Sequence, residues 1–172
     1  MTESQLLVNA CNIIADYIKD EFIKQGHSLT EAWENSVIVQ EGSDNSAEIW
    51  ATGYGMIVDA GITPERIPYG GQGTGGDGTL SKYILGLQRF WLLRKPGITD
   101  KQALKLAFAT AEVQKQEGMS TIASEGYSAT GNRQHFMQAI DTLFKESLDD
   151  WIFTGLDVIV NEQADEPKVL YL

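Results

Sequence analysis

Hydrophobic positions recur at helical spacing at the start of the chain. From Ser4 to Gln25 an apolar residue returns every three or four positions, which predicts one amphipathic helix with a single buried stripe. Gly26 follows at once, and glycine is the residue that helix C-termini favour. Cys11 occupies an apolar position of this helix, which favours a small core residue kept as a thiol in a reducing compartment.

The next pattern predicts a short helix and a β-hairpin. An acidic first turn suits a short helix over residues 30–36. The β-branched run 37–39 favours a strand, residues 42–45 (Gly-Ser-Asp-Asn) are typical of a turn, and residues 47–52 alternate in polarity, so together they predict a hairpin. Residues 54–60 are short and apolar, which is compatible with one or two helical turns or with the end of a strand.

Helical periodicity returns in the second half of the chain. Leu80–Lys95 is strongly amphipathic and ends at a Pro-Gly pair. Asp100–Gln116 follows a capping-box pattern, and its apolar positions are rich in alanine, which favours close helix packing. A long helix is expected over Asn132–Phe153, and the β-branched Leu156–Val160 predicts a final strand.

Two stretches lack periodicity. Residues 62–79, which include the run GGQGTGGDG, and residues 118–131, rich in Ser, Thr and Gly, are expected to be extended loops. Residues 161–172 are expected to form an acidic C-terminal tail. The pattern predicts one α+β domain over residues 1–172, in which amphipathic helices pack on a small antiparallel β-sheet beside a long glycine-rich loop.

Composition and charge exclude some function classes. The chain has 172 residues, with 24 acidic against 13 basic side chains and a formal charge of −11. Wrapping duplex DNA requires a basic surface, so nucleic acid is not expected as the main ligand. No apolar run approaches the length of a membrane span and no secretory segment opens the chain, so a soluble protein made in the cytoplasm is expected.

The charge is unevenly distributed along the chain. Residues 1–60 carry −8 and residues 141–172 carry −6, whereas residues 81–115 carry +5. One interpretation is that the basic residues are simply the solvated faces of two helices. The other is that identical subunits of a ring set a basic flank against the acidic flank of a neighbour.

Little in the sequence predicts catalysis or a cofactor. The glycine run contains a formal GxGxxG at Gly71, Gly73 and Gly76, but a Pro-containing segment precedes it where a dinucleotide site needs a strand. The two histidines, His27 and His135, have no metal-ligand spacing. No nucleophile motif surrounds Ser124, and the adjacent carboxylates of Asp149 and Asp150 would diverge on a helix. No enzyme activity, metal or cofactor is therefore expected.

The order of elements resembles a known family. It comprises an amphipathic helix, a short helix with the hairpin strand (GHSLTEAWENSVIV), a strand that runs into a Tyr-Gly pair (AEIWATGYGMIVDAG), a Pro-containing loop (ITPERIPYGG) and an alanine-rich helix that ends at Gly-Met (LAFATAEVQKQEGMST). This order resembles the tail-completion or neck proteins of long-tailed bacteriophages, the lambda-type minor tail protein Z group. The resemblance covers roughly Leu6–Leu143.

The resemblance implies a virion structural protein, made in the host cytoplasm, that forms a homo-oligomeric ring at the head–tail junction. Its partners would be connector, stopper or other neck and tail proteins, with DNA at most passing through the ring and repelled by its acidic excess. The two loops supply the expected partner contacts, which are Ile67, Tyr69, Gly70, Gly73, Met119, Ile122 and Tyr127. Alternatively these side chains anchor the loops to their own subunit. The rival functions are a small hydrolase or peptidase with an unidentified nucleophile, and a soluble protein-binding adaptor.

Overall fold

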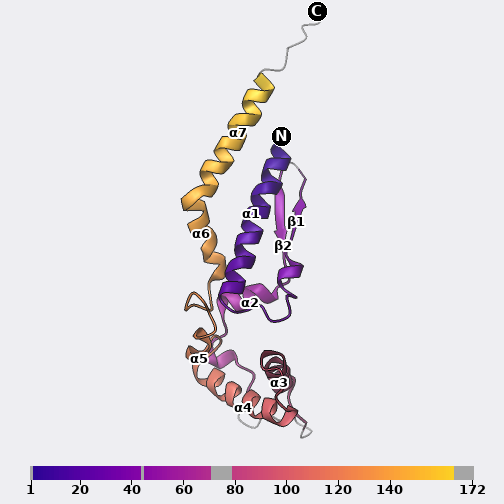
Figure 1. Ribbon diagram of the computed structural model, residues 1–172, viewed down its shortest axis with the longest axis vertical. Coiled ribbons are helices and arrows are strands. Elements are labelled where there is room, and N and C mark those ends of the chain that lie inside the picture. The colour runs from indigo at the N-terminus through magenta and orange to yellow at the C-terminus, as the bar shows by residue number, and fades with distance from the viewer. Residues whose placement is uncertain (1, 44, 71–78, 165–172) are drawn as a thin grey trace, which may run out of the picture. The chain divides into compact units, whose positions relative to one another are not determined.

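The chain has an α+β fold, as predicted, with mostly helices and one small sheet (Figure 1). The computed structural model describes residues 2–43, 45–70 and 79–164, without the side chains of residues 144, 146 and 160–164. The helices are α1 (Glu3–Lys24), α2 (Tyr54–Ala60), α3 (Lys82–Arg94), α4 (Asp100–Glu117), α5 (Ile122–Glu125), α6 (Ala139–Leu143) and α7 (Asp149–Ala164). Short 3-10 turns cover Glu34–Ser36, Pro64–Arg66 and Phe136–Gln138, and a π-helical turn covers Phe144–Leu148.

The sheet is the predicted hairpin. Strands β1 (Ile38–Glu41) and β2 (Ala47–Trp50) pair antiparallel, with Ile38 opposite Trp50 and Val39 opposite Ile49. The Ile38–Trp50 pair lies on the exposed face, and the Val39–Ile49 pair lies on the face that is half-buried. The alternation of the sequence therefore matches the alternation of burial.

The chain forms two compact units. Unit 1 comprises residues 1–23, 32–52 and 135–172, and unit 2 comprises residues 24–31 and 53–134. The expectation of a single domain over 1–172 concerns how the two units combine, and it stays a prediction.

Unit 1 has an aromatic core. The ring of Phe22 on α1 stacks on Trp33 at 4.3 Å between centroids, and Phe136 meets both rings edge-on at 5.2 and 5.3 Å. Phe22 and Phe136 are fully buried, and Trp33 donates its indole N–H to the carbonyl of Thr52. These rings join the end of α1 to the segment that leads into α6.

Helices α1 and α7 approach closely within unit 1. A Cβ added at Gly155 would lie 2.4 Å from Leu6 Cδ1, so a side chain at position 155 would collide with the buried Leu6. Ile159, four residues later on the same face of α7, is also buried. The glycine therefore sets the distance between the two helices.

Unit 2 is built on the packing of α3 against α4. Ala103, Ala107 and Ala111 of α4 are fully buried, as their predicted role in close packing requires, and Ile84 of α3 is buried with them. The predicted capping box is also present, because the Thr99 hydroxyl accepts from Gln102 N and the Gln102 side chain accepts from Thr99 N. This cap fixes where α4 begins.

Loop residues complete the core of unit 2. Ile62 and Met119 exchange two backbone hydrogen bonds of 2.7 Å, which join the segment before the glycine-rich loop to the end of α4. Ile67 and Tyr69 are buried in the α3–α4 core, and the Tyr69 hydroxyl donates to Glu112 at 2.9 Å. Residues 71–78 of the expected loop 62–79 lie outside the described residues.

Two predictions in the C-terminal part are corrected. The helix expected over Asn132–Phe153 is present from Ala139 onward, after the 3-10 turn Phe136–Gln138, but its expected start is wrong, because His135 adopts a left-handed conformation (φ 60°) and the Asn132 side chain accepts a turn-forming bond from Gln134 N. The strand expected over Leu156–Val160 is part of α7 instead. Gly155 lies against Leu6 of α1, and Ile159, four residues later on the same face, is buried, so tertiary packing outweighs the strand preference of β-branched residues.

Two shorter predictions also change. The helix expected over residues 30–36 is reduced to the 3-10 turn Glu34–Ser36, since Glu31 has a positive φ of 55° that interrupts an α-helix. The loop expected over residues 118–131 contains α5, whose first turn is capped by Thr121 and Ser124. Helix α7 extends through Ala164 into the expected tail, and residues 165–172 lie outside the described residues.

Candidate functional site

Unit 2 contains a cavity of about 450 Å³, which is within the usual range of ligand pockets. Its apolar wall comes from α2, α3 and α4, and its polar end comes from the turn after α1, the start of α2 and the segment after α4. The apolar wall includes Ile57, Val58, Leu87, Phe90, Trp91, Leu106, Ala109 and Val113. The polar end includes His27, Tyr54, Ser124, Tyr127 and Arg133. Every lining residue belongs to unit 2, so the cavity is a property of this unit alone.

Trp91 is held in the apolar wall by a hydrogen-bond chain. Its indole N–H donates to the Thr110 hydroxyl at 2.9 Å, and this hydroxyl donates in turn to the carbonyl of Leu106 at 2.8 Å. Both partners belong to α4, so the polar atom of the tryptophan is satisfied inside the helix pair while its ring faces the cavity. The wall is therefore preformed.

Arg133 is the cation of the polar end. One terminal nitrogen donates to the Ser124 carbonyl at 3.3 Å, and the other lies 3.3 Å from the Gly26 carbonyl and 3.1 Å from His27 Nδ1. All three acceptors are formally neutral. Among the described residues Arg133 has no carboxylate partner, and its buried Nε has no hydrogen-bond partner there. The guanidinium is thus positioned by neutral groups and keeps its full charge.

The backbone around Gly26 permits this arrangement. Gly26 has a φ of 73°, and a Cβ at this position would lie 2.3 Å from the carbonyl oxygen of Tyr127. Only glycine combines this conformation with such a close approach. The turn after α1 can therefore present both the Gly26 carbonyl and the His27 ring to Arg133.

His27 is neutral at physiological pH. Burial and then the positive charge of Arg133 lower the pKa of its imidazole from 6.5 to about 4. A neutral ring with its proton on Nε2 leaves Nδ1 free to accept from Arg133. Burial followed by the nearby Arg94 lowers the pKa of Arg133, although an arginine stays protonated at any physiological pH.

A second arginine lies close to this end of the cavity. The guanidinium of Arg94, at the end of α3, lies over the ring of Tyr127 at 4.6 Å from its centroid. Tyr127 lines the cavity, so this contact holds one side of the polar end in place. Two arginines therefore lie at this end of the cavity, in a chain whose overall charge is −11.

The predicted contact residues fall in different places. Met119 and Tyr127 line the cavity, and Ile122 is 74% exposed on α5 beside it. Ile67 and Tyr69 are buried in their own unit, as the loop-anchor alternative describes. Gly70 is exposed, and Gly73 lies outside the described residues. Contact of any of these residues with a partner stays a prediction.

Sequence reasoning missed the polar residues of the cavity. Arg133 is an isolated basic residue after a Ser/Thr/Gly-rich stretch, and His27 has no metal-ligand spacing with the other histidine. They lie 106 positions apart in the chain, so no local pattern reveals their contact. The local signal for the position of His27 was Gly26, because a glycine that ends a helix turns the next residue away from the helix axis.

The side chains considered for catalysis have other roles in the structure. The Ser124 hydroxyl donates to the Thr121 carbonyl at 2.7 Å and accepts from Thr121 N, which caps α5. Cys11 is a half-buried thiol on α1, and burial raises its pKa. Within residues 2–43, 45–70 and 79–164, no group of three or more His, Cys, Asp or Glu side chains is placed to hold a metal ion. None of the described helices combines the length and apolar content needed to span a bilayer.

Comparison with known proteins gives no match. No family model, no curated protein and no solved structure matches the chain.

Proposed function

We propose that the chain is a non-enzymatic structural subunit of a bacteriophage virion, which forms a homo-oligomeric ring at the head–tail junction and contacts neck, connector or tail proteins. The observation that carries this proposal is the separation of charge between the two units. Unit 1 has 16 acidic and 3 basic side chains, whereas unit 2 has 8 acidic and 10 basic, against 24 and 13 in the chain. The order of elements that resembles the neck proteins supports the same assignment.

Opposite charges on two parts of one subunit favour head-to-tail association. In a ring, each copy presents one surface to the copy before it and a different surface to the copy after it. If the first surface is acidic and the second basic, the correct contact is attractive, and contacts between like surfaces are repulsive. The charge separation thus specifies the order of surfaces in a closed ring.

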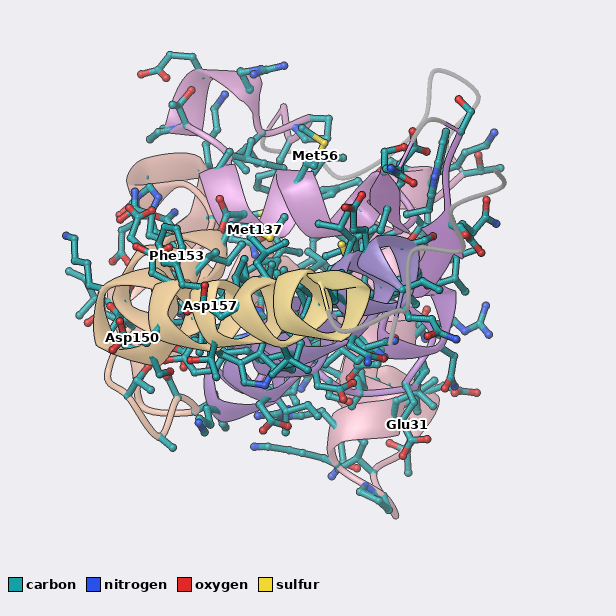
Figure 2. The ribbon with its side chains drawn as sticks, turned by 90° about the horizontal axis from the view of Figure 1, so that it is seen from above. Glu31, Met56, Met137, Asp150, Phe153 and Asp157 are labelled. Atoms are coloured by element: carbon teal, nitrogen blue, oxygen red, sulfur yellow. The ribbon has the colours of Figure 1, made fainter. Side chains whose placement is uncertain are left out.

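Two exposed helix stripes provide surfaces of this kind. On α3, the basic stripe consists of Lys82, Leu85, Arg89 and Leu93, spaced by three or four residues, and both leucines are 46% exposed. On α7, the acidic stripe consists of Asp150, Phe153 and Asp157, with Phe153 66% exposed (Figure 2). Each stripe combines charge with large apolar side chains, as interfaces do. We propose that the basic stripe of one copy packs on the acidic stripe of the next.

Charge reversal tests this contact in solution. Lys82→Glu with Arg89→Glu, or Asp150→Lys with Asp157→Lys, should each abolish rings in negative-stain images, because either pair places like charges together. Mixing the two variants should restore rings that alternate between them. The matched control is Asp16→Lys with Asp20→Lys on α1, which changes the charge by the same amount outside the stripes and should leave the rings intact. Rings that survive both reversals would rule out the contact.

The virion assignment needs a separate test. Immunogold labelling of phage particles with an antibody to this chain should place gold at the head–tail junction. Particles that lack the chain, or label elsewhere, would contradict the assignment. In the ring, the acidic excess would let DNA pass without adhering to the wall.

A protein-binding adaptor is the second candidate, and the cavity of unit 2 favours it. An adaptor would bind its partner as a monomer. Light scattering distinguishes the two functions, because an adaptor keeps the 19.0 kDa mass of one chain and a ring subunit does not.

A further inference from the structure

Arg133 is a cation at the polar end of the cavity of unit 2. Arg133 is fixed at its polar end by two carbonyls and the neutral His27 ring, and among the described residues no carboxylate pairs with it. Its Nε is buried without a hydrogen-bond partner in that part of the chain. A partly desolvated cation is stabilised most strongly by a carboxylate, which accepts from a guanidinium in a bidentate geometry. An occupant that fits both ends carries a carboxylate next to apolar side chains.

Two stretches of the chain longer than one residue lie outside the described residues. Residues 71–78 read GQGTGGDG, with one carboxylate and no large apolar side chain. Residues 165–172 read DEPKVLYL, with two adjacent carboxylates, at Asp165 and Glu166, and an apolar run from Val169 to Leu172. Only the second has the composition that the cavity requires.

We propose that the cavity of each subunit binds the segment Asp165–Leu172 of a neighbouring copy. In this complex Asp165 or Glu166 pairs with Arg133, and the apolar run packs on the wall that contains Phe90 and Trp91. The segment belongs to the acidic unit 1 and the cavity to the basic unit 2. This contact therefore joins unit 1 of one copy to unit 2 of another, as the proposed contact between stripes does. Lys168, the one basic residue of the segment, keeps its ammonium in water at the end of a long side chain. The inference rests on the proposed ring, since it names a second contact between the same neighbours.

Site-specific photo-cross-linking in the full chain tests this binding. Benzoylphenylalanine replaces Phe90, which lines the cavity, in one sample, and Leu85, an exposed residue of the same helix that does not line it, in another. Each sample mixes chains labelled with ¹⁵N and unlabelled chains, so that mass spectrometry separates links between copies from links within one copy. We expect position 90 to link to residues 165–172 of a different copy, and position 85 to link to α7 of a different copy.

The two positions separate the two proposals. Links from position 85 to α7 without links from position 90 to residues 165–172 would overturn the inference and leave the ring intact. Links from position 90 to residues 165–172 of the same copy would also overturn it. Links from position 90 to that segment of a second copy, with none from position 85 to α7, would contradict the proposed stripe contact and support the inference.

Charge variants then test the role of Arg133. Arg133→Gln should lower the yield of the position-90 link at least about tenfold, as expected for the loss of a charged hydrogen bond. Because Arg133 also holds two backbone carbonyls, the reciprocal variant Asp165→Asn with Glu166→Gln removes the charge without touching the cavity and should lower the yield equally. Asp16→Asn with Asp20→Asn, on α1, is the matched control and should leave the yield unchanged. A yield that is the same in the Asp165/Glu166 variant and in the control would overturn the proposed pairing.

Discussion

Arg133 and His27 form a polar contact in the lining of the cavity. His27 Nδ1 can accept from Arg133 only while the imidazole is neutral, and the lowered pKa of the ring keeps it so. Protonation would place two cations 3.1 Å apart and remove the acceptor. The geometry of the cavity is therefore coupled to pH through a single side chain.

This coupling predicts a loss of stability in mild acid. The pKa of His27 is about 4 in the fold, against 6.5 for an unperturbed histidine, so the unfolded state binds the proton more tightly. The stabilisation is complete above pH 6.5 and is lost as the pH falls from 6.5 to 4. Because the ring is partly open to solvent, we expect His27 to account for a loss of only about 1 kcal/mol between pH 7 and 5.

Urea denaturation at pH 7 and at pH 5 measures this loss. In His27→Gln the decrease in the free energy of unfolding should be smaller than in the wild type by about that amount, about 1 kcal/mol. The matched control is His135→Gln, in unit 1, which should show the wild-type decrease. An equal decrease in the wild type and in His27→Gln would contradict the role of this histidine.

In unit 1, Phe136 belongs to the cluster of aromatic rings that forms the core. It is fully buried and meets both Phe22 and Trp33 edge-on. Phe136→Ala should lower the free energy of unfolding by about 3–5 kcal/mol, because it leaves a cavity among aromatic rings. Phe153→Ala removes the same side chain from a 66% exposed position on α7 and should cost less than about 0.5 kcal/mol in about 1 M sodium chloride, where the proposed ring is dissociated. Similar values for the two variants, measured in urea, would show that the aromatic cluster does not hold unit 1 together.

At the scale of elements, α4 has two faces with different roles. Ala103, Ala107 and Ala111 are buried against α3, and Ala109 is exposed and lines the cavity. The first face sets the distance between the helices, and the second contributes to the cavity wall. An alanine-to-leucine substitution on each face tests these two roles.

Ala107→Leu should destabilise the protein by about 1–3 kcal/mol, since the added atoms have no space between α3 and α4. Ala109→Leu should change stability by less than about 0.5 kcal/mol, because the added side chain extends into open space. Thermal unfolding followed by circular dichroism distinguishes the two variants. A larger effect at position 109 than at position 107 would mean that the faces of α4 are assigned incorrectly.

The sequence predicted a helix or strand correctly wherever the structure depends on residues that are close together in the chain. The stripe of α1, the capping box at Thr99 and the alternation in the hairpin all act within a few residues, and all three were predicted correctly. The region 156–160 was predicted wrongly, because it belongs to a helix whose Gly155 lies against Leu6, about 150 residues away in the chain, and whose Ile159 is buried. The cavity depends on contacts of the same long range, such as that between Arg133 and His27.

In the molecule as a whole, charge is divided between the two units. One chain carries an acidic unit and a mildly basic one, and each exposes a helix stripe that combines charge with large apolar side chains. In the proposed ring, these two surfaces would bring copies of the chain together in a fixed order. Salt weakens this contact, since the charges involved are exposed to solvent.

The native mass of the purified chain across a salt series tests the proposed ring. At low ionic strength we expect a single closed assembly whose mass is a whole multiple of 19.0 kDa, which dissociates as sodium chloride is raised towards about 1 M. A mass of 19.0 kDa at every salt and protein concentration would contradict the proposed ring.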